Sequence, residues 1–162
     1  MNSKVYEVID AIIEHLQADD GLQDVRDFHR MNGFAVPRRP TISVGAENVK
    51  YETDTRDLDR AEAEIKVYVY LDDRELERGE STAWELASRI RLSLLSNRYL
   101  GGILEDLEVK GIQAVYAEVS NSNLHACQVD VTAIYYEERR KQAPFQPIEH
   151  LQRDIAQDQG GA

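Results

Sequence analysis

The sequence contains a single cysteine and lacks the residue spacings of common metal sites. One cysteine in 162 residues excludes an internal disulfide framework and is compatible with a reducing compartment. His125 and Cys127 are two residues apart and could share a metal ion, but a structural zinc site needs about four ligands and no other motif supplies them. Asp54, Asp57 and Asp59 lack the glycine and the terminal glutamate of a calcium loop. We therefore expect no metal ion and no cofactor.

The motifs of common enzyme classes are also missing. Gly101-Gly102 is not followed by the Lys-Ser/Thr pair of a phosphate-binding P-loop, and no G-x-S-x-G nucleophile elbow occurs. His15 and His29 have no serine or cysteine in a recognisable nucleophile context. Distant residues can still assemble a site in the fold. The sequence nevertheless predicts no catalytic residue, and we expect a protein that is not an enzyme.

The chain has neither a surplus of basic residues nor a long apolar run. Its formal charge of −11 disfavours a general nucleic-acid-binding surface, although it is compatible with DNA that passes by without binding. No apolar stretch approaches the length that spans a bilayer, and the first residues do not resemble a secretory signal. We expect a globular chain with a core of ordinary size.

The clearest element is an amphipathic helix that we expect over Thr82–Asn97. Thr82 and Glu85 have the spacing of a capping box, which predicts the start of the helix. Apolar residues then recur at helical spacing on one face: Ala83, Leu86, Ala87, Ile90 and Leu94. Ser93 falls largely away from this stripe. Because only one face is apolar, the helix needs a sheet to lie on.

The rest of the chain supplies a second helix and that sheet. Ser3–Leu16 has an apolar stripe with acidic residues between and predicts the first helix. The strand predictions are Thr41–Val44, Ala63–Leu71, Val109–Val119 and Ala126–Tyr136. Leu22–Met31 is either a short strand, which we favour, or a helical turn. The turn Ser120–Asn123 predicts that the last two strands pair as an antiparallel hairpin. The expected fold class is α+β, a mostly antiparallel sheet with two helices packed on it.

Two polar stretches carry no core pattern. Gly45–Arg60 is mostly charged and is either an exposed hairpin or a mobile loop. The apolar periodicity stops after Glu137, so we expect one domain over 1–140 and a flexible C-terminal tail over 141–162.

Arginines and carboxylates are the candidate contact residues. In this acidic chain the arginines can pair with the carboxylates of a neighbouring copy and build a charge-matched interface, although solvation or pairing within the chain is the ordinary explanation. The candidate subunit or partner contacts are Arg38, Arg39, Asp54, Asp57, Arg89, Arg91 and Arg98.

The run Arg98-Tyr99-Leu100-Gly101-Gly102 after the long helix, followed by a hairpin that ends in Val131–Tyr136, resembles the tail terminator proteins of long-tailed phages. The resemblance is strongest over Trp84–Tyr136 and extends to the order of elements over Met1–Arg140.

The resemblance implies a structural virion protein. Such proteins form a hexameric ring that caps the last ring of the tail tube, ends tail growth and presents a surface to the head connector. The implied partners are other copies of the chain and the tail tube protein, with possible contacts to sheath and connector proteins. DNA would pass through without specific binding. The implied location is the tail or neck of a virion assembled in the host bacterial cytoplasm. The alternatives are a head–tail joining (neck) protein of the same fold, a component of a headless phage-tail-like particle, and a non-viral cytoplasmic binding domain.

Overall fold

A computed structural model describes residues 3–36, 39–116 and 123–139. Its helices are α1 (Lys4–Gln17) and α2 (Leu76–Ser96), and short 3₁₀ turns lie at Asp20–Leu22 and Leu100–Gly102. The strands are β1 (Asp27–Arg30), β2 (Thr41–Thr55), β3 (Leu58–Asp72), β4 (Asp106–Val115) and β5 (Leu124–Glu138). They form one sheet in the order β1-β2-β3-β5-β4. Only the β1–β2 pair is parallel. The predicted α+β class is therefore confirmed.

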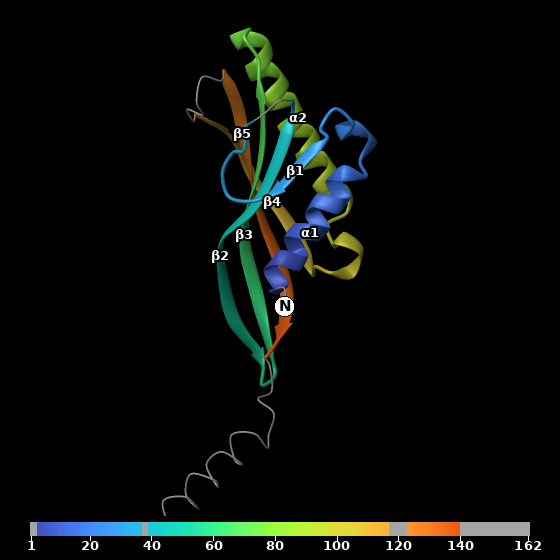
Figure 1. The fold of residues 1–162 in the computed structure, drawn as a ribbon. Helices are drawn as coiled ribbons and strands as arrows, with labels where there is room; N and C mark the ends of the chain where they lie inside the picture. Colours follow the sequence, from blue (N-terminus) through green and yellow to red (C-terminus); the bar gives the residue numbers. More distant parts are fainter. Residues whose placement is uncertain (1–2, 37–38, 117–122, 140–162) are drawn as a thin grey trace, which may run out of the picture.

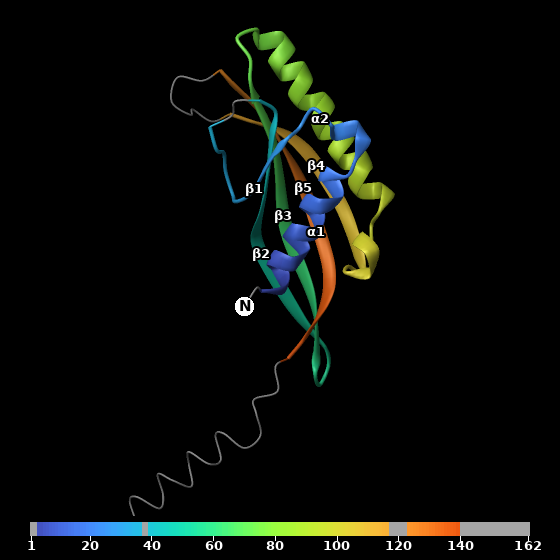
Figure 2. The ribbon, with the colours of Figure 1, turned by 45° about the vertical axis from the view of Figure 1, so that its right-hand side comes forward.

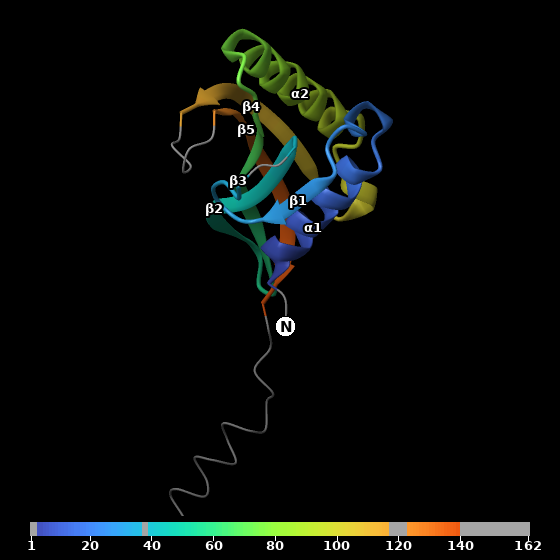
Figure 3. The same ribbon diagram turned by 45° about the horizontal axis from the view of Figure 1, so that its top comes forward.

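Both helices lie on the same face of the sheet (Figures 1 and 2). α2 crosses over β3, β5 and β4, and α1 packs beside it against β1 and β2. Figure 3 shows the twisted sheet on one side and the two helices together on the other. The second face of the sheet carries no helix among the described residues.

The core lies between the helices and the sheet, where the sequence pattern places it. The apolar stripe of α2 is buried, and so are the alternate residues of β3 and β5 that face it. Ile65, Val67 and Val69 pair with Val131, Val129 and Cys127 in the centre of this layer. The predicted apolar stripe of α2 and the predicted inner faces of β3 and β5 are therefore confirmed.

Ser93 is an exception to the predicted helix face. It is buried between the two helices, where the His15 Nε2 lies 2.8 Å from the Ser93 carbonyl oxygen and 3.2 Å from its hydroxyl. His15 therefore links α1 to α2, because its ring N–H can donate to that carbonyl. From the sequence alone, a small polar residue on a helix is predicted to face solvent, because its hydrogen-bond partner on another element is not known.

The start of α2 also differs from the prediction. The helix begins at Leu76, so Thr82 lies well inside it and the proposed capping box is wrong. The backbone N–H of Glu75 instead donates to the Asp73 carboxylate at 3.0 Å. Leu76–Ser81, which precede the predicted start of the helix, thus belong to it.

The polar stretch Gly45–Arg60 is the hairpin that joins β2 and β3, and not a mobile loop. Its strands are paired in register up to Thr55 and Leu58. The Arg139 guanidinium fastens the tip, because it donates to Asp59 at 2.7 Å and to the Thr53 hydroxyl at 2.8 Å. Deletion of the tip would therefore remove sheet pairing. The tail predicted over 141–162 lies outside the described residues, and the division into domain and tail stays a prediction.

Candidate assembly surfaces

The sheet has two long open edges on opposite sides of the molecule. β4 is the last strand on one side, and its outer edge pairs with no other described strand over Asp106–Val115. On the other side β1 covers β2 only over Thr41–Val44. The Asn32 side chain donates to the Ala46 carbonyl at 2.7 Å, so the open part of the β2 edge begins after Ala46. Unpaired strand edges offer rows of backbone donors and acceptors to another chain.

An apolar groove lies beside one of these edges, where the first turns of α2 overhang the end of β4. Its cavity volume is about 270 Å³. Small residues form the floor, among them Ala83, Ala114 and Ala126. Leu76 and Tyr116 stand at the rim and are 69% and 91% exposed.

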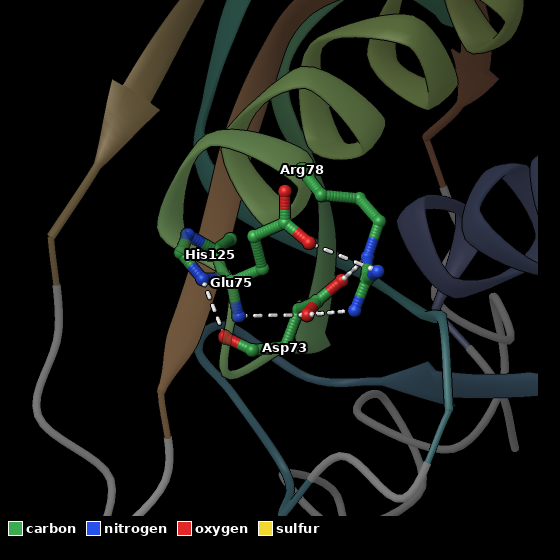
Figure 4. A network of polar contacts seen from close by, with 4 residues as sticks. All are labelled: Asp73, Glu75, Arg78 and His125. Atoms are coloured by element: carbon green, nitrogen blue, oxygen red, sulfur yellow. Dashed lines mark hydrogen bonds and ion pairs between the residues drawn. The ribbon is translucent and has the colours of Figure 1, made fainter.

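A polar network holds the start of α2 above this groove (Figure 4). The Arg78 guanidinium donates twice to the Asp73 carboxylate, at 2.8 Å each, and lies 3.0 Å from the Glu75 carboxylate. The His125 Nε2 lies 3.0 Å from the Asp73 carbonyl oxygen, to which it can donate. The hydrogen bonds from Arg78 hold the pKa of Asp73 down at about 2, with a further contribution from the Glu75 N–H. Asp73 is therefore ionised at neutral pH.

Gly79 is part of the same arrangement. It is buried against the His125 ring, and a Cβ atom at this position would lie 2.2 Å from the ring's Cδ2. A glycine inside a helix normally costs about 1 kcal/mol relative to alanine. Here it lets the helix approach the side chain that anchors it.

The face of the sheet without helices is charged in its middle part, whereas nearer β1 the Phe34 ring packs against Tyr68 and Tyr70. Glu62, Glu64 and Lys66 of β3 alternate with the buried residues of that strand and point away from the helices. Lys66 lies 2.7 Å from Asp130 and 3.4 Å from Glu47, and its pKa is raised, chiefly by the hydrogen bond to Asp130. Lys66 is therefore paired with carboxylates of β2 and β5, and this middle part of the face is acidic on balance.

The candidate arginines are distributed over three separate regions. Arg39 pairs with Asp27 at 3.0 Å near β1, and Arg89 pairs with Glu85 at 2.6 Å on α2. Arg98 pairs with Asp106 at 2.8 Å where α2 leads toward β4. Arg91 is exposed on α2 and forms no ion pair with any described residue, whereas Arg38 lies outside the described residues.

The two candidate carboxylates, Asp54 and Asp57, lie together at the exposed hairpin tip, far along the sheet from α2. The fold therefore does not gather the candidate residues into one site. Their role as subunit contacts stays a prediction.

The open edges and the groove are not marked by the charged residues from which the candidate contacts were predicted. Tyr51, 58% exposed on the open part of β2, and Trp84 beside the groove are the apolar residues that mark them. Both are aromatic residues at positions outside the buried face of their helix or strand, and this is the sequence signal that could have located the edge and the groove. No group of three or more histidine, cysteine, aspartate or glutamate residues with metal-binding geometry occurs among the described residues. Within that same part of the chain, no helix is long and apolar enough to cross a membrane.

Comparison with known proteins finds similarity in structure alone. No family model matches the sequence, and no curated protein matches it either. Among solved structures, the fold is similar to that of a chain from the virion of a native gene transfer agent (GTA) particle, with a TM-score of 0.51. The identity is 14%, and the match covers 85% of this chain and 100% of the other. The likeness therefore shows a shared fold that spans the whole of a virion chain.

Proposed function

We propose that this chain is a structural, non-enzymatic virion component that assembles as a homomeric ring on the end of a tail tube. In this role it ends the growth of the tube and provides the joint to the head connector. The observation that carries the proposal is the fold similarity to a complete chain of a GTA virion. The sequence resemblance to tail terminators supports the more specific role.

The two open edges of the sheet support a ring. A head-to-tail contact closes into a ring only if each copy offers two different surfaces that complement each other. The β4 edge and the open part of the β2 edge are different surfaces on opposite sides of one sheet. Because the helices cover one face, the charged face would line the inside of such a ring. Its acidic balance would repel DNA phosphates and allow DNA to slide through without binding.

Deletion of the gene from the particle-producing strain tests the proposed role. A terminator role predicts tail tubes of uncontrolled length, because nothing stops tube growth. A head–tail joining role, which is the alternative, predicts tails of normal length that are not attached to heads. Negative-stain electron microscopy of the lysate distinguishes these outcomes, and a plasmid copy of the wild-type gene is the control. Normal particles in the deletion strain would contradict both roles and favour a binding domain unrelated to the virion.

A further inference from the structure

The direction of the strands determines how two copies can meet edge to edge. β2 and β5 run one way, and β3 and β4 run the other, because each neighbouring pair is antiparallel. Rotation about a ring axis does not change a strand's direction along that axis. The β4 strand of one copy and the β2 strand of the next would therefore be antiparallel. That is the geometry in which two ordinary strand edges pair.

The alternation of side chains restricts the register. We call a line of paired residues that crosses the strands of the sheet a row. Val49 and Tyr51 of β2 lie in the same rows as Ala63 and Ala61 of β3, on the helix-covered face. On β4 the corresponding residues are Val109 and Ile112, which flank a bulge. A one-residue slip would turn every side chain to the wrong face. Apolar residues of the two edges can therefore meet only if the copies are offset by an even number of rows.

The lengths of the open edges limit the offset further. Val49 lies in the row of Leu107, because Val49 pairs with Ala63, Ala63 pairs with Ala133, and Ala133 pairs with Leu107. Without an offset, the open part of β2 would extend beyond the end of β4, since β4 begins at Asp106. An offset of four rows brings Val49 opposite Ile112 and places the open part of β2 fully along β4.

We infer that the copies of the proposed ring join by adding the open edge of β2 to the β4 edge of the next copy, with Val49 opposite Ile112 and Tyr51 opposite Val109. This inference rests on the ring of the proposed function and specifies its subunit contact. Tyr51, which is exposed in the single chain, would be covered by the neighbouring copy. Asn32, bound to the Ala46 carbonyl, would end the added pairing.

The same offset gives the sheet a strand tilt suitable for a closed barrel. Each copy contributes four strands to the wall, namely β2, β3, β5 and β4. An offset of four rows across four strands gives a tilt of about 35°, from a rise of about 3.3 Å per residue and a spacing of about 4.8 Å between strands. Closed barrels have tilts of about 35–45°. With six copies the backbone radius would be about 22 Å, a channel wide enough for duplex DNA.

Disulfide trapping tests this contact directly. In the purified full chain, the double variant Val49→Cys/Ile112→Cys would be oxidised under conditions in which rings form, and analysed by non-reducing electrophoresis. Directly opposite residues of an antiparallel pair have a Cα separation compatible with a disulfide. We expect a ladder of multimers that ends at the size of the ring. Tyr51→Cys/Val109→Cys is a second pair that should give the same ladder.

The matched control is Val49→Cys/Gln113→Cys. Gln113 neighbours Ile112 on the exposed edge strand, but its side chain points to the opposite face. This variant should remain monomeric on the gel, and so should the wild-type chain, whose Cys127 is buried. Circular dichroism of each reduced variant checks that it is folded.

The outcomes separate the contact from the ring. Rings that form by mass photometry but give no ladder with either pair would overturn the edge contact and leave the proposed function standing. Cross-linking of Tyr51→Cys with Ile112→Cys in place of the two expected pairs would overturn the register. Absence of rings in every condition would overturn the proposed function and this contact together.

Discussion

Replacement of Gly79 by alanine should change the stability of the fold in opposite directions, depending on residue 125. In the wild-type background the new Cβ would meet the His125 ring, which must move away and lose its contact with the Asp73 carbonyl. Steric overpacking costs about 1–3 kcal/mol. The gain in helix propensity from glycine to alanine offsets about 1 kcal/mol of this. We therefore expect Gly79→Ala to lower the free energy of unfolding by up to about 2 kcal/mol.

In a His125→Ala background the obstacle is absent. The same Gly79→Ala change should then raise the free energy of unfolding by about 1 kcal/mol, because only the propensity gain remains. The assay is urea unfolding of the four chains of this double-mutant cycle, at a protein concentration at which the chain is monomeric. Equal effects of Gly79→Ala in both backgrounds, or a stabilising effect in the wild type, would refute the close packing of α2 against His125.

Three further predictions concern the core, the acid response and assembly. Ile90→Ala should lower the free energy of unfolding by about 2–5 kcal/mol, because Ile90 is fully buried on the inner face of α2, whereas replacement of the exposed Leu92 on the same helix by alanine should change it far less; urea denaturation measures both. The pKa of Asp73 is held at about 2, so its contribution to stability is complete above its unfolded value of about 3.8 and is lost as the pH falls toward 2. Asp73→Asn should therefore remove part of the acid dependence of the unfolding midpoint over this range, and a wild-type slope in the variant would contradict the Arg78 contact. Six copies would carry 6 × −11 = −66 formal charges. Ring formation should consequently be weaker at low salt and stronger near 0.1 M, where the screening length is about 10 Å, and sedimentation velocity across a salt series would detect the opposite trend if the reasoning fails.

The elements with a strong apolar period could be predicted from the sequence. Ile65, Val67 and Val69 alternate with charged or aromatic residues, so that strand and its buried face followed from the pattern alone. The hairpin of β4 and β5 followed from the turn residues between them. Elements of this kind are predictable because the spacing of their apolar residues along the chain indicates which one face is buried.

Features that depend on distant residues were not predictable in this way. The start of α2 is determined by Asp73, which also contacts His125 from another strand, so Thr82 gave the stronger local signal and the wrong position. The outer part of β2 has no buried residue after Gly45, so its order comes from backbone pairing with β3 and from Arg139, which follows β5. The open edges could not be recognised at all without the strand order, because an edge is defined by the neighbour that is missing.

The central claim is that the chain forms a ring that caps a tail tube, and cryo-electron microscopy of the purified chain mixed with assembled tubes of its cognate tube protein tests it most directly. We expect one ring at a tube end, with the helices outside and the charged part of the sheet toward the channel. Mass photometry of the same ring without tubes should give the mass of six copies of 18.5 kDa, about 111 kDa. Tubes with bare ends, beside a chain that stays monomeric at every salt and protein concentration, would contradict the account.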